Sequence, residues 1–526
     1  MAAAAAAAAA VKQLHPKLLH LFCFNPIFDT SEATEHEKLL YFWPPDVAQD
    51  AQMKAVGLVE AMIKYSSTFS KDQPCEVVHT KKARMVFYNP EPNFWLSLAV
   101  TLPFSQKAKK DGPVTEYHDE NVQNVVLHSL LRQTYTMYKL FNGTFTSVLD
   151  AFNRQALVDK LELFFPQHIE TLDLEHSDVV EAFNGIQFLP LDKNTFLKVQ
   201  SFVNLTESKF PSIHYTVFVY HDHLIWSGLE QEDMRVLYKH LTQGLPPLSA
   251  GGPGAQAEVV GSPGGDAAAR ADARVSLSPQ SKPAAPQMMG FLTGPEDLKD
   301  PETPINAPRL FVTAEDDREL HLVTYACDET KMCFLVDADV IHDLDFYRQL
   351  AAFVGESLLQ IERELGEQHQ KRTSSHPEVQ YKYLYFNHMN LAQKSSFMTL
   401  PKKCGRPTVS TVSPEYIRYL TDMHTDFTGT LEESEIILKT EGDCWIVGRQ
   451  SDQRQFFVIL AQKNANLIEI NEEIRRLSSS HFGQSATMPR ACVRLSLLTK
   501  NVVRHNILQG TFLWLTRMPP QYSERV

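Results

Sequence analysis

Cysteine is scarce in this chain and follows no disulfide or metal-binding spacing. The 526 residues hold 7 cysteines, an odd number, and no two of them form a CxxC pair. Disulfide frameworks and structural zinc sites need paired or clustered cysteines, so neither is indicated. A reducing, cytoplasmic compartment is therefore the expected location.

Long apolar runs and a basic surplus are also missing. No apolar stretch approaches the ~18 residues of a transmembrane helix, so we expect any membrane contact to be peripheral or made through a partner. The 63 acidic residues outnumber the 50 Lys and Arg and give a net charge of −13. Nucleic-acid-binding proteins usually carry a basic surface, so no nucleic-acid partner is expected.

The common catalytic signatures are absent as well. The sequence contains no GxxxxGK[ST], GxGxxG, HExxH or GxSxG, which argues against an NTPase, a dinucleotide enzyme, a zinc protease and a serine hydrolase. His221 and His223 flank one aspartate in a predicted turn, but a metal site needs three or four converging ligands. We predict no catalytic residue, no metal site and no cofactor.

The segment Tyr215–Leu241 contains two apolar, β-branched runs, TVFVY and LIWS, joined by the polar turn His221–His223. An acidic stretch follows, and Met234, Leu237, Tyr238 and Leu241 then fall on one helical face. Acidic residues favour the first turn of a helix, and the period of 3.6 favours an amphipathic helix. The segment is therefore predicted as strand, strand, helix.

The same pattern opens three units of the form ββαβββα. The middle unit continues with strands Arg309–Thr313, Glu319–Cys327 and Lys331–Asp337 and helix Leu344–Leu365. The last has a strand from Tyr381 with a short partner strand, helix Pro414–Phe427, strands Glu435–Lys439, Cys444–Arg449 and Gln455–Ala461, and helix Ile468–Leu477. The first has strands Leu18–Asn25 and Lys38–Trp43, helix Asp46–Tyr65, strands near Cys75–Tyr88 and Phe94–Leu102, and helix Val122–Phe141. Its fifth strand is not identified. Antiparallel strands with flanking helices indicate three related α+β domains.

These units divide the chain into six parts. The stretch 244–290 has eight Gly, seven Pro and no aromatic residue, so it cannot bury a core and is read as an insertion within the middle domain. The expected parts are a disordered Ala-rich N-terminus (1–16), a first domain (17–175), a bridging strand and helix (176–211), a second domain (212–372) with the disordered insertion 244–290, a third domain (377–480) and an atypical C-terminal tail (481–526).

Glycine interrupts the first predicted helix. Val56, Val59, Met62 and Ile63 fall on one face, which core packing explains, whereas Gly57 lies in mid-helix. Glycine there is about 1 kcal/mol less favourable than alanine, so a packing reason such as a bound partner is expected.

Several long strings resemble one known family. They are LFNGTF (140–145), FLPLDKNTFLKVQSFVN (188–204), LIWSGLEQEDMRVLYKHLT (224–242), FLTGP (291–295), YFNHMNLAQKS (385–395) and QKNANLIEINEE (462–473). In this order they are similar to the Ccz vacuolar fusion proteins of animals, and the resemblance spans residues 17–480. It implies a tri-longin protein in which each longin domain is a five-stranded antiparallel sheet flanked by helices.

The resemblance also implies a function shared between chains. Ccz proteins pair with a Mon subunit to form a guanine-nucleotide exchange factor for the late-endosomal and lysosomal Rab GTPase, Rab seven, and animal complexes carry a third regulatory subunit. An exchange factor binds the nucleotide-poor GTPase better than the loaded one, so the chain need not be an enzyme by itself. The expected place of action is the cytoplasmic surface of late endosomes and lysosomes, where the chain would be peripheral.

In this family the GTPase lies across the paired first longin domains. The resemblance therefore implies an interface at the exit of the second strand and the first helix, formed by Trp43, Pro44, Pro45, Asp46, Val47, Lys54 and Gly57. Pro44-Pro45 is equally compatible with the start of a helix, where proline is favoured.

A basic cluster of Lys402, Lys403 and Arg406 fits anionic endosomal lipid, at about 1 kcal/mol per charge near such a surface, although an ordinary exposed loop explains it too. Longin folds serve many roles, so a trafficking scaffold without exchange activity is the alternative. The tail 481–526 resembles nothing in the family.

Overall fold

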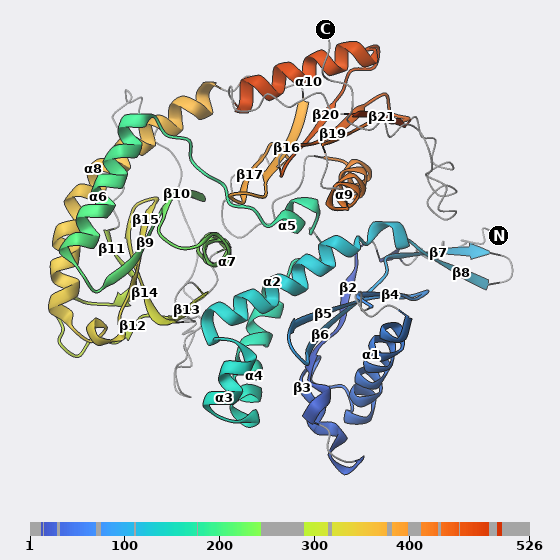
Figure 1. Cartoon of the computed structure of the whole chain (residues 1–526), viewed down its shortest axis with the longest axis horizontal. Coiled ribbons are helices and arrows are strands. Elements are labelled where there is room, and N and C mark those ends of the chain that lie inside the picture. The colour runs from blue at the N-terminus through green and yellow to red at the C-terminus, as the bar shows by residue number, and fades with distance from the viewer. Residues whose placement is uncertain are drawn as a thin grey trace, which may run out of the picture. The chain divides into compact units, whose positions relative to one another are not determined.

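The computed structural model describes residues 12–13, 15–28, 32–69, 75–109, 112–175, 177–243, 289–313, 318–375, 381–397, 412–429, 433–451, 453–482 and 492–496. These residues form two compact units. The first consists of the described residues within 1–135, 154–187 and 376–526, and the second of those within 136–153 and 188–375. Figure 1 labels most of the helices and strands of both.

The first unit contains a five-stranded antiparallel sheet in the order β3-β2-β6-β5-β4. Its elements are β2 (Lys17–Phe24), η1 (Pro26–Phe28), η2 (Glu32–Lys38), β3 (Leu39–Trp43), α1 (Gln49–Phe69), β4 (Val77–His79), β5 (Ala83–Glu91) and β6 (Phe94–Thr101). The stretch expected as a single strand near Cys75–Tyr88 therefore holds β4 and most of β5, which supplies the missing fifth strand. Phe22 and Phe24 point to the α1 side, where they form a core with Val56 and Val59.

The edge strand β3 is covered by α4 (Arg154–Thr171). Tyr41 of β3 stacks on Phe165 with ring centroids 4.7 Å apart. The Arg154 guanidinium donates from Nη2 to the carbonyl of Leu39 and from Nε to that of Glu37, both at 3.0 Å. The outer edge of this sheet is thus occupied by side chains of the same unit.

A small second sheet in this unit has the order β1-β7-β8. It consists of β1 (Lys12–Gln13), β7 (Phe104–Lys109) and β8 (Gly112–Tyr117). It is followed by η3 (Asp119–Asn121) and α2 (Asn124–Asn142), whose residues from Thr136 on belong to the second unit. Lys12 pairs with Ser105 and Gln13 with Phe104. The expectation of disorder throughout 1–16 is therefore wrong for Lys12 and Gln13, which the backbone of β7 holds in place.

The second unit is built on a larger sheet, ordered β10-β9-β15-β14-β11-β12, with β13 also paired to β14. Its elements are α3 (Phe145–Ala151), β9 (Ile213–Tyr220), β10 (His223–Ser227), α7 (Gln231–Gln243), β11 (Met289–Pro295), β12 (Ile305–Asn306), β13 (Arg309–Val312), β14 (Arg318–Cys327), β15 (Thr330–Val336), η5 (Ala338–Val340) and α8 (Leu344–Ser375). The five expected strands are present, and β11 and β12 extend the sheet beyond five. Met289 and Gly290 belong to β11 and not to a disordered insertion, while residues 244–288 lie outside the described residues.

The predicted bridge contains two helices, α5 (Val179–Phe183) and α6 (Lys193–Lys209). Asp192 caps α6 by accepting from the backbone N–H of Thr195 at 3.2 Å. Val199 and Val203 of α6 are buried in the core of the second unit. The string GIQFLPL forms no continuous strand. In its place the structure has two isolated bridges. Ile186 pairs with Ala392 within the first unit, and Phe188 pairs with Leu224 within the second.

The fourth sheet, that of the third predicted domain, belongs to the first unit and has the order β17-β16-β20-β19-β18-β21. Its elements are β16 (Tyr381–Asn387), β17 (Ala392–Ser395), α9 (Pro414–Thr428), β18 (Ser434–Lys439), β19 (Trp445–Ser451), β20 (Arg454–Leu460), α10 (Leu467–Phe482) and β21 (Cys492–Ser496). Five strands are antiparallel, and β21, from the predicted tail, pairs parallel to β18 as a sixth. Ile470 and Ile474 of α10 pack on one face of the sheet. On the other face, Gly448 permits α9 to approach, since an added Cβ there would lie 3.1 Å from Met423 Sδ.

Three large sheets, antiparallel except for the pairing of β21, and their flanking helices confirm the α+β class. Within the described ranges, none of the helices has both the length and the apolar composition of a membrane span.

Candidate interaction site on helix α1

The predicted interface begins at the turn between β3 and α1. Trp43 ends β3, the Trp43–Pro44 peptide bond is cis, and α1 begins only at Gln49. Pro44 and Pro45 therefore lie in a turn ahead of the helix, and their interpretation as a helix start is wrong. The Gln52 side chain donates from Nε2 to the carbonyl of Val47 at 2.8 Å and ties the turn to the first turn of α1.

Helix α1 uses one face to cover the sheet. Val56 and Val59 are each only 1% exposed, and Ile63 packs against the same core as Phe22 and Phe24. Met62 was expected on this face, but it is 36% exposed. The helix therefore rests on the sheet through a narrower set of side chains than its sequence predicts.

A second apolar face of α1 is open to solvent. Leu58, Met62, Tyr65 and Phe69 recur at i, i+4, i+7 and i+11, a spacing that aligns side chains along one side of a helix. Their exposures are 46%, 36%, 66% and 76%. The rings of Tyr65 and Phe69 meet edge to face with centroids 5.0 Å apart. We call these four residues the α1 stripe. Contiguous exposed apolar side chains of this kind mark interaction sites.

Gly57 lies beside the α1 stripe and is half-buried. A Cβ built at Gly57 would meet no atom within 4 Å. Packing within the described residues therefore does not explain why α1 carries a residue about 1 kcal/mol less favourable than alanine. The backbone at Gly57 is left open to close approach from outside the chain.

Charged side chains border the open face. Lys54 Nζ lies 2.6 Å from Asp50 Oδ2, and both side chains are largely exposed. Such an exposed i,i+4 pair is worth only about 0.3–0.5 kcal/mol, so either member can exchange its partner at little cost. Lys38 and Glu60 form a more sheltered pair at 3.3 Å, with side chains 11% and 12% exposed.

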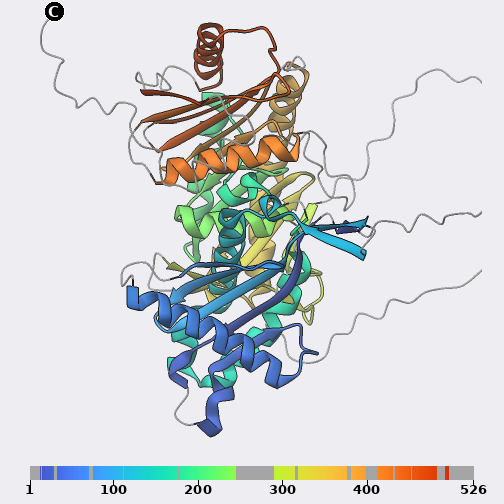
Figure 2. The same ribbon diagram turned by 90° about the vertical axis from the view of Figure 1, so that its right-hand side faces the viewer.

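The structure thus brings the predicted residues onto one turn and helix. Trp43, Pro44 and Val47 are half-buried in the turn, Pro45 and Asp46 are exposed there, and Lys54 and Gly57 lie further along α1. Figure 2 shows α1 lying along one face of its sheet. The α1 stripe itself was not predicted, although its spacing of 58, 62, 65 and 69 is visible in the sequence.

The remaining candidates from the sequence are the basic cluster and the two histidines near the turn between β9 and β10. Lys402, Lys403 and Arg406 lie outside the described residues. His221 Nδ1 is 3.2 Å from Glu329, and His223 Nδ1 is 2.9 Å from Asp222. Among the residues that the structure describes, no group of three or more His, Cys, Asp or Glu side chains is arranged to hold a metal ion.

Three longin families match successive parts of the chain. Residues 18–143 match the first longin domain of INTU, CCZ1 and HPS4. Residues 213–355 match Intu longin-like domain 2, and residues 377–477 match Intu longin-like domain 3. The α1 site lies within the first of these matches.

Curated relatives match nearly the whole chain. A vacuolar fusion protein CCZ1 homologue from Nematostella vectensis is 45% identical over 469 residues, which cover 89% of this chain and 97% of the relative. One from Danio rerio is 41% identical over 90% of this chain and 96% of the relative. One from Dictyostelium discoideum is 30% identical over 86% of this chain and 94% of the relative.

Proposed function

Because this chain belongs to the family of vacuolar fusion protein CCZ1 homologues, we propose that it is one subunit of a heteromeric guanine-nucleotide exchange factor. Membership of this family supports a role in vacuolar fusion. The finer proposal is that the chain pairs with a Mon subunit through longin domains and activates the late-endosomal and lysosomal Rab GTPase, Rab seven. A third regulatory subunit would join them in animals.

The observation that carries this proposal is the open apolar face of α1. An isolated soluble chain gains nothing from exposing Leu58, Tyr65 and Phe69 on one helix, whereas burial of such aromatic side chains dominates the energy of protein interfaces. Gly57, with nothing within 4 Å of its Cβ position, would let a second backbone approach the helix closely. We therefore assign the Mon partner to the α1 stripe and Gly57.

The turn Trp43–Val47 and Lys54 would then lie at the border of the paired domains and face the GTPase. Such a surface makes or breaks no covalent bond. It acts by binding the nucleotide-poor GTPase more tightly than the loaded one, and this differential affinity drives nucleotide and its magnesium out. The chain is accordingly not an enzyme by itself in this proposal.

The proposed place of action is the cytoplasmic face of late endosomes and lysosomes, where the complex would promote endosome maturation, vesicle fusion and autophagy. Contact with anionic lipid through Lys402, Lys403 and Arg406 remains part of the proposal, and each such charge near the membrane surface is worth about 1 kcal/mol.

The test is to co-purify the chain with its Mon partner and to time the release of fluorescent GDP from the Rab. We expect release well above the intrinsic rate. Complex formation without any acceleration would instead support the alternative, a longin-type trafficking scaffold without exchange activity. Failure to form the complex at all would refute both the partner and the exchange activity.

A matched pair of variants locates the interface. Phe69→Ala removes a side chain that is 76% exposed on α1, and Phe152→Ala removes one that is 67% exposed outside the proposed site. Only Phe69→Ala should weaken binding to the Mon partner. Equal binding by both variants would contradict the assignment to α1.

A further inference from the structure

The connecting segment Asp178–Ile186 in the first unit contains the five-residue helix α5. A helix this short leaves nearly all of its backbone groups without intrahelical partners, so other groups must supply them. At its start, the Asp178 carboxylate accepts from the N–H of Val180 at 2.8 Å. Val179 is fully buried and Val180 is 9% exposed. The segment is therefore held by its surroundings and not by its own length.

Helix α2 of the first domain supplies the partners at the other end of α5. Ser129 Oγ donates to the carbonyl of Ala182 at 3.0 Å, and Gln133 Nε2 donates to that of Glu181 at 3.1 Å. Gln133 also donates to Ser129 Oγ at 2.9 Å. These side chains satisfy the C-terminal carbonyls of α5, so the segment is fixed to the first domain by hydrogen bonds.

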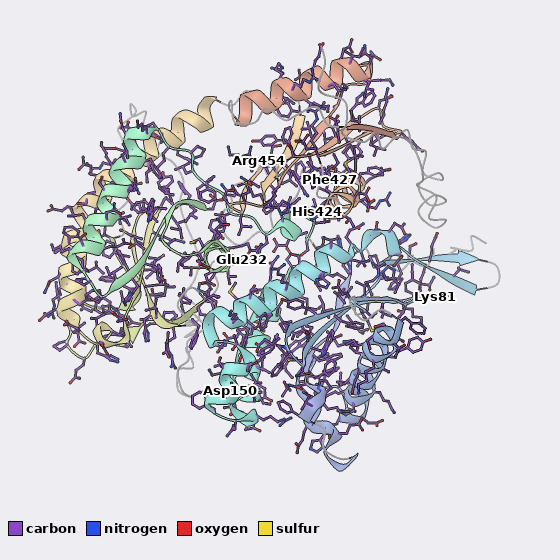
Figure 3. All side chains as sticks on the ribbon, in the orientation of Figure 1. Lys81, Asp150, Glu232, His424, Phe427 and Arg454 are labelled. Atoms are coloured by element: carbon purple, nitrogen blue, oxygen red, sulfur yellow. The ribbon has the colours of Figure 1, made fainter. Side chains whose placement is uncertain are left out.

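The third domain receives the aromatic side chain of the same helix. Phe183 is 3% exposed, and its ring centroid lies 4.4 Å from that of His424, 4.7 Å from that of Phe386 and 6.0 Å from that of Phe457. His424 belongs to α9 (Figure 3), and the two phenylalanines belong to β16 and β20. We use the name α9 groove for the surface of α9, β16 and β20 that these three rings form around Phe183.

The residues after Phe183 reach the edge of β17, where Ile186 forms one isolated bridge with Ala392. Ile186 donates its N–H to the carbonyl of Leu391 and accepts from the N–H of Gln393, both at 2.8 Å. The Gly185 N–H donates to Gln393 Oε1 at 3.1 Å. A Cβ at Gly185 would lie 2.4 Å from the Cβ of Gln393, so only glycine fits this approach. The segment thus adds backbone pairing at a sheet edge to an aromatic anchor, a combination typical of peptide recognition.

We infer that the α9 groove of the third longin domain is a peptide-binding site, and that the chain's own segment Asp178–Ile186 occupies it. The ligand chemistry is a single helical turn with an acidic N-cap, an aromatic anchor, a glycine and a β-branched residue that pairs with β17. In this arrangement the segment also couples the third domain to α2 of the first domain. The inference does not depend on exchange activity.

A tethered segment competes with any free peptide at an effective concentration of about millimolar. The wild-type groove should therefore exclude a free copy of the segment. Phe183→Ala weakens the tethered segment and should open the groove to that copy.

The test uses the full chain and a fluorescent peptide with the sequence of residues 177–188, read by anisotropy. Phe183→Ala should bind the peptide at least about tenfold more tightly than the wild type does, since the tethered competitor has lost its anchor. A peptide with alanine in place of Phe183 should bind neither protein. Equal binding by wild type and variant, with the circular dichroism spectrum preserved, would overturn the inference.

Hydrogen exchange provides a second readout. The amide of Gln393 is bonded to Ile186 in the wild type, so fragments covering β17 should exchange faster in Phe183→Ala. Phe456→Ala is the matched control, because Phe456 lies on the opposite face of β20 in the core with α10. It should destabilise the third domain without opening the α9 groove. Peptide binding gained equally by both variants would also overturn the inference.

Gly185→Ala repeats the test without removing a buried ring. The added Cβ would collide with Gln393, whereas Gly290→Ala adds a Cβ that meets nothing within 4 Å. Should Phe183→Ala unfold the third domain, Gly185→Ala must still admit the free peptide and Gly290→Ala must not. Exclusion of the peptide by Gly185→Ala would refute the proposed groove.

Discussion

Helices α1 and α9 follow the opening hairpin of two longin domains, but their surroundings differ. Phe183, from a connecting segment of the same chain, contacts His424 on α9. In the second unit, Phe141 likewise lies 4.8 Å from His240 of α7. Among the described residues, no comparable aromatic side chain covers the α1 stripe. Two of the three helices that follow an opening hairpin, α7 and α9, are therefore contacted by an aromatic side chain from elsewhere in the chain, whereas the α1 stripe is exposed.

The largest effect should come from removing the cover of α9. Phe183→Ala deletes a buried phenylalanine, and such deletions cost about 3–5 kcal/mol. We expect a loss of that size in the free energy of unfolding of the first unit, measured by denaturant titration. Phe69→Ala on α1 should change the same quantity by no more than about 0.5 kcal/mol. Similar losses for the two variants would erase the distinction between the covered and the open helix.

Acid should weaken the covered helix α7. Burial lowers the pKa of His240 to about 4, whereas in the unfolded chain the pKa is about 6.5. The folded state therefore binds fewer protons between these values. Stability from the neutral His240 is complete above pH 6.5 and falls as the pH drops toward 4, by about 3 kcal/mol in all.

Melting temperatures of the wild type and of His240→Gln between pH 7 and 4 measure this contribution. The variant should lose less stability on acidification, because glutamine does not titrate. Phe141→Ala should also reduce the loss of stability on acidification, but by less than His240→Gln does. The reason is that exposing His240 returns its pKa toward 6.5. An identical pH slope in all three proteins would contradict the role of burial.

The affinity for the Mon partner should depend on exposed side chains of α1 that contribute little to the stability of the free chain. Tyr65→Ala on α1 should weaken the complex with the Mon partner by about 2 kcal/mol, the size of an interface hot spot, while leaving the melting temperature of the free chain unchanged. Surface plasmon resonance with the immobilised partner measures the first quantity. Unaltered affinity would mean that the α1 stripe is covered by something else.

Substitution of Gly57 should have two smaller effects of opposite sign, one on the stability of the free chain and one on partner affinity. Gly57→Ala should stabilise the free chain by up to about 1 kcal/mol through helix propensity. The same methyl group should weaken binding of the Mon partner by about tenfold, or 1.4 kcal/mol, if a second backbone approaches there. Gly366→Ala in α8 serves as the control, because its Cβ would meet only the Tyr220 hydroxyl at 3.5 Å. It should leave partner binding unchanged.

Much of the fold could be predicted because its elements are long and periodic. The helix expected at Pro414–Phe427 spans Pro414–Thr428 in the structure, and the strand expected at Lys331–Asp337 spans Thr330–Val336. Helix α5 was not predicted as a separate helix, because five residues are too few to show a period of 3.6. The two-residue strand β1 is likewise defined only by its partner β7.

The candidate site was harder to predict from the sequence than the fold was. Helix α1 carries apolar side chains on two faces, so periodicity alone could not tell which face meets the sheet, and Met62 was assigned to the wrong one. The residues Trp43–Val47, Lys54 and Gly57 came from family resemblance, and their role remains a prediction. Their location at the start of α1 and on its open side depends on tertiary packing that no local pattern encodes.

The hydrogen bonds from Arg154 of α4 to the carbonyls of Glu37 and Leu39 also bear on whether another chain can add to this sheet. An edge strand with free carbonyls is a template on which another chain can extend the sheet, and such growth leads to aggregation. Arg154 occupies the carbonyls of Glu37 and Leu39, and α4 lies alongside that edge. Arg154 and α4 therefore hinder the addition of a further strand at this edge, next to a helix whose apolar side chains are exposed.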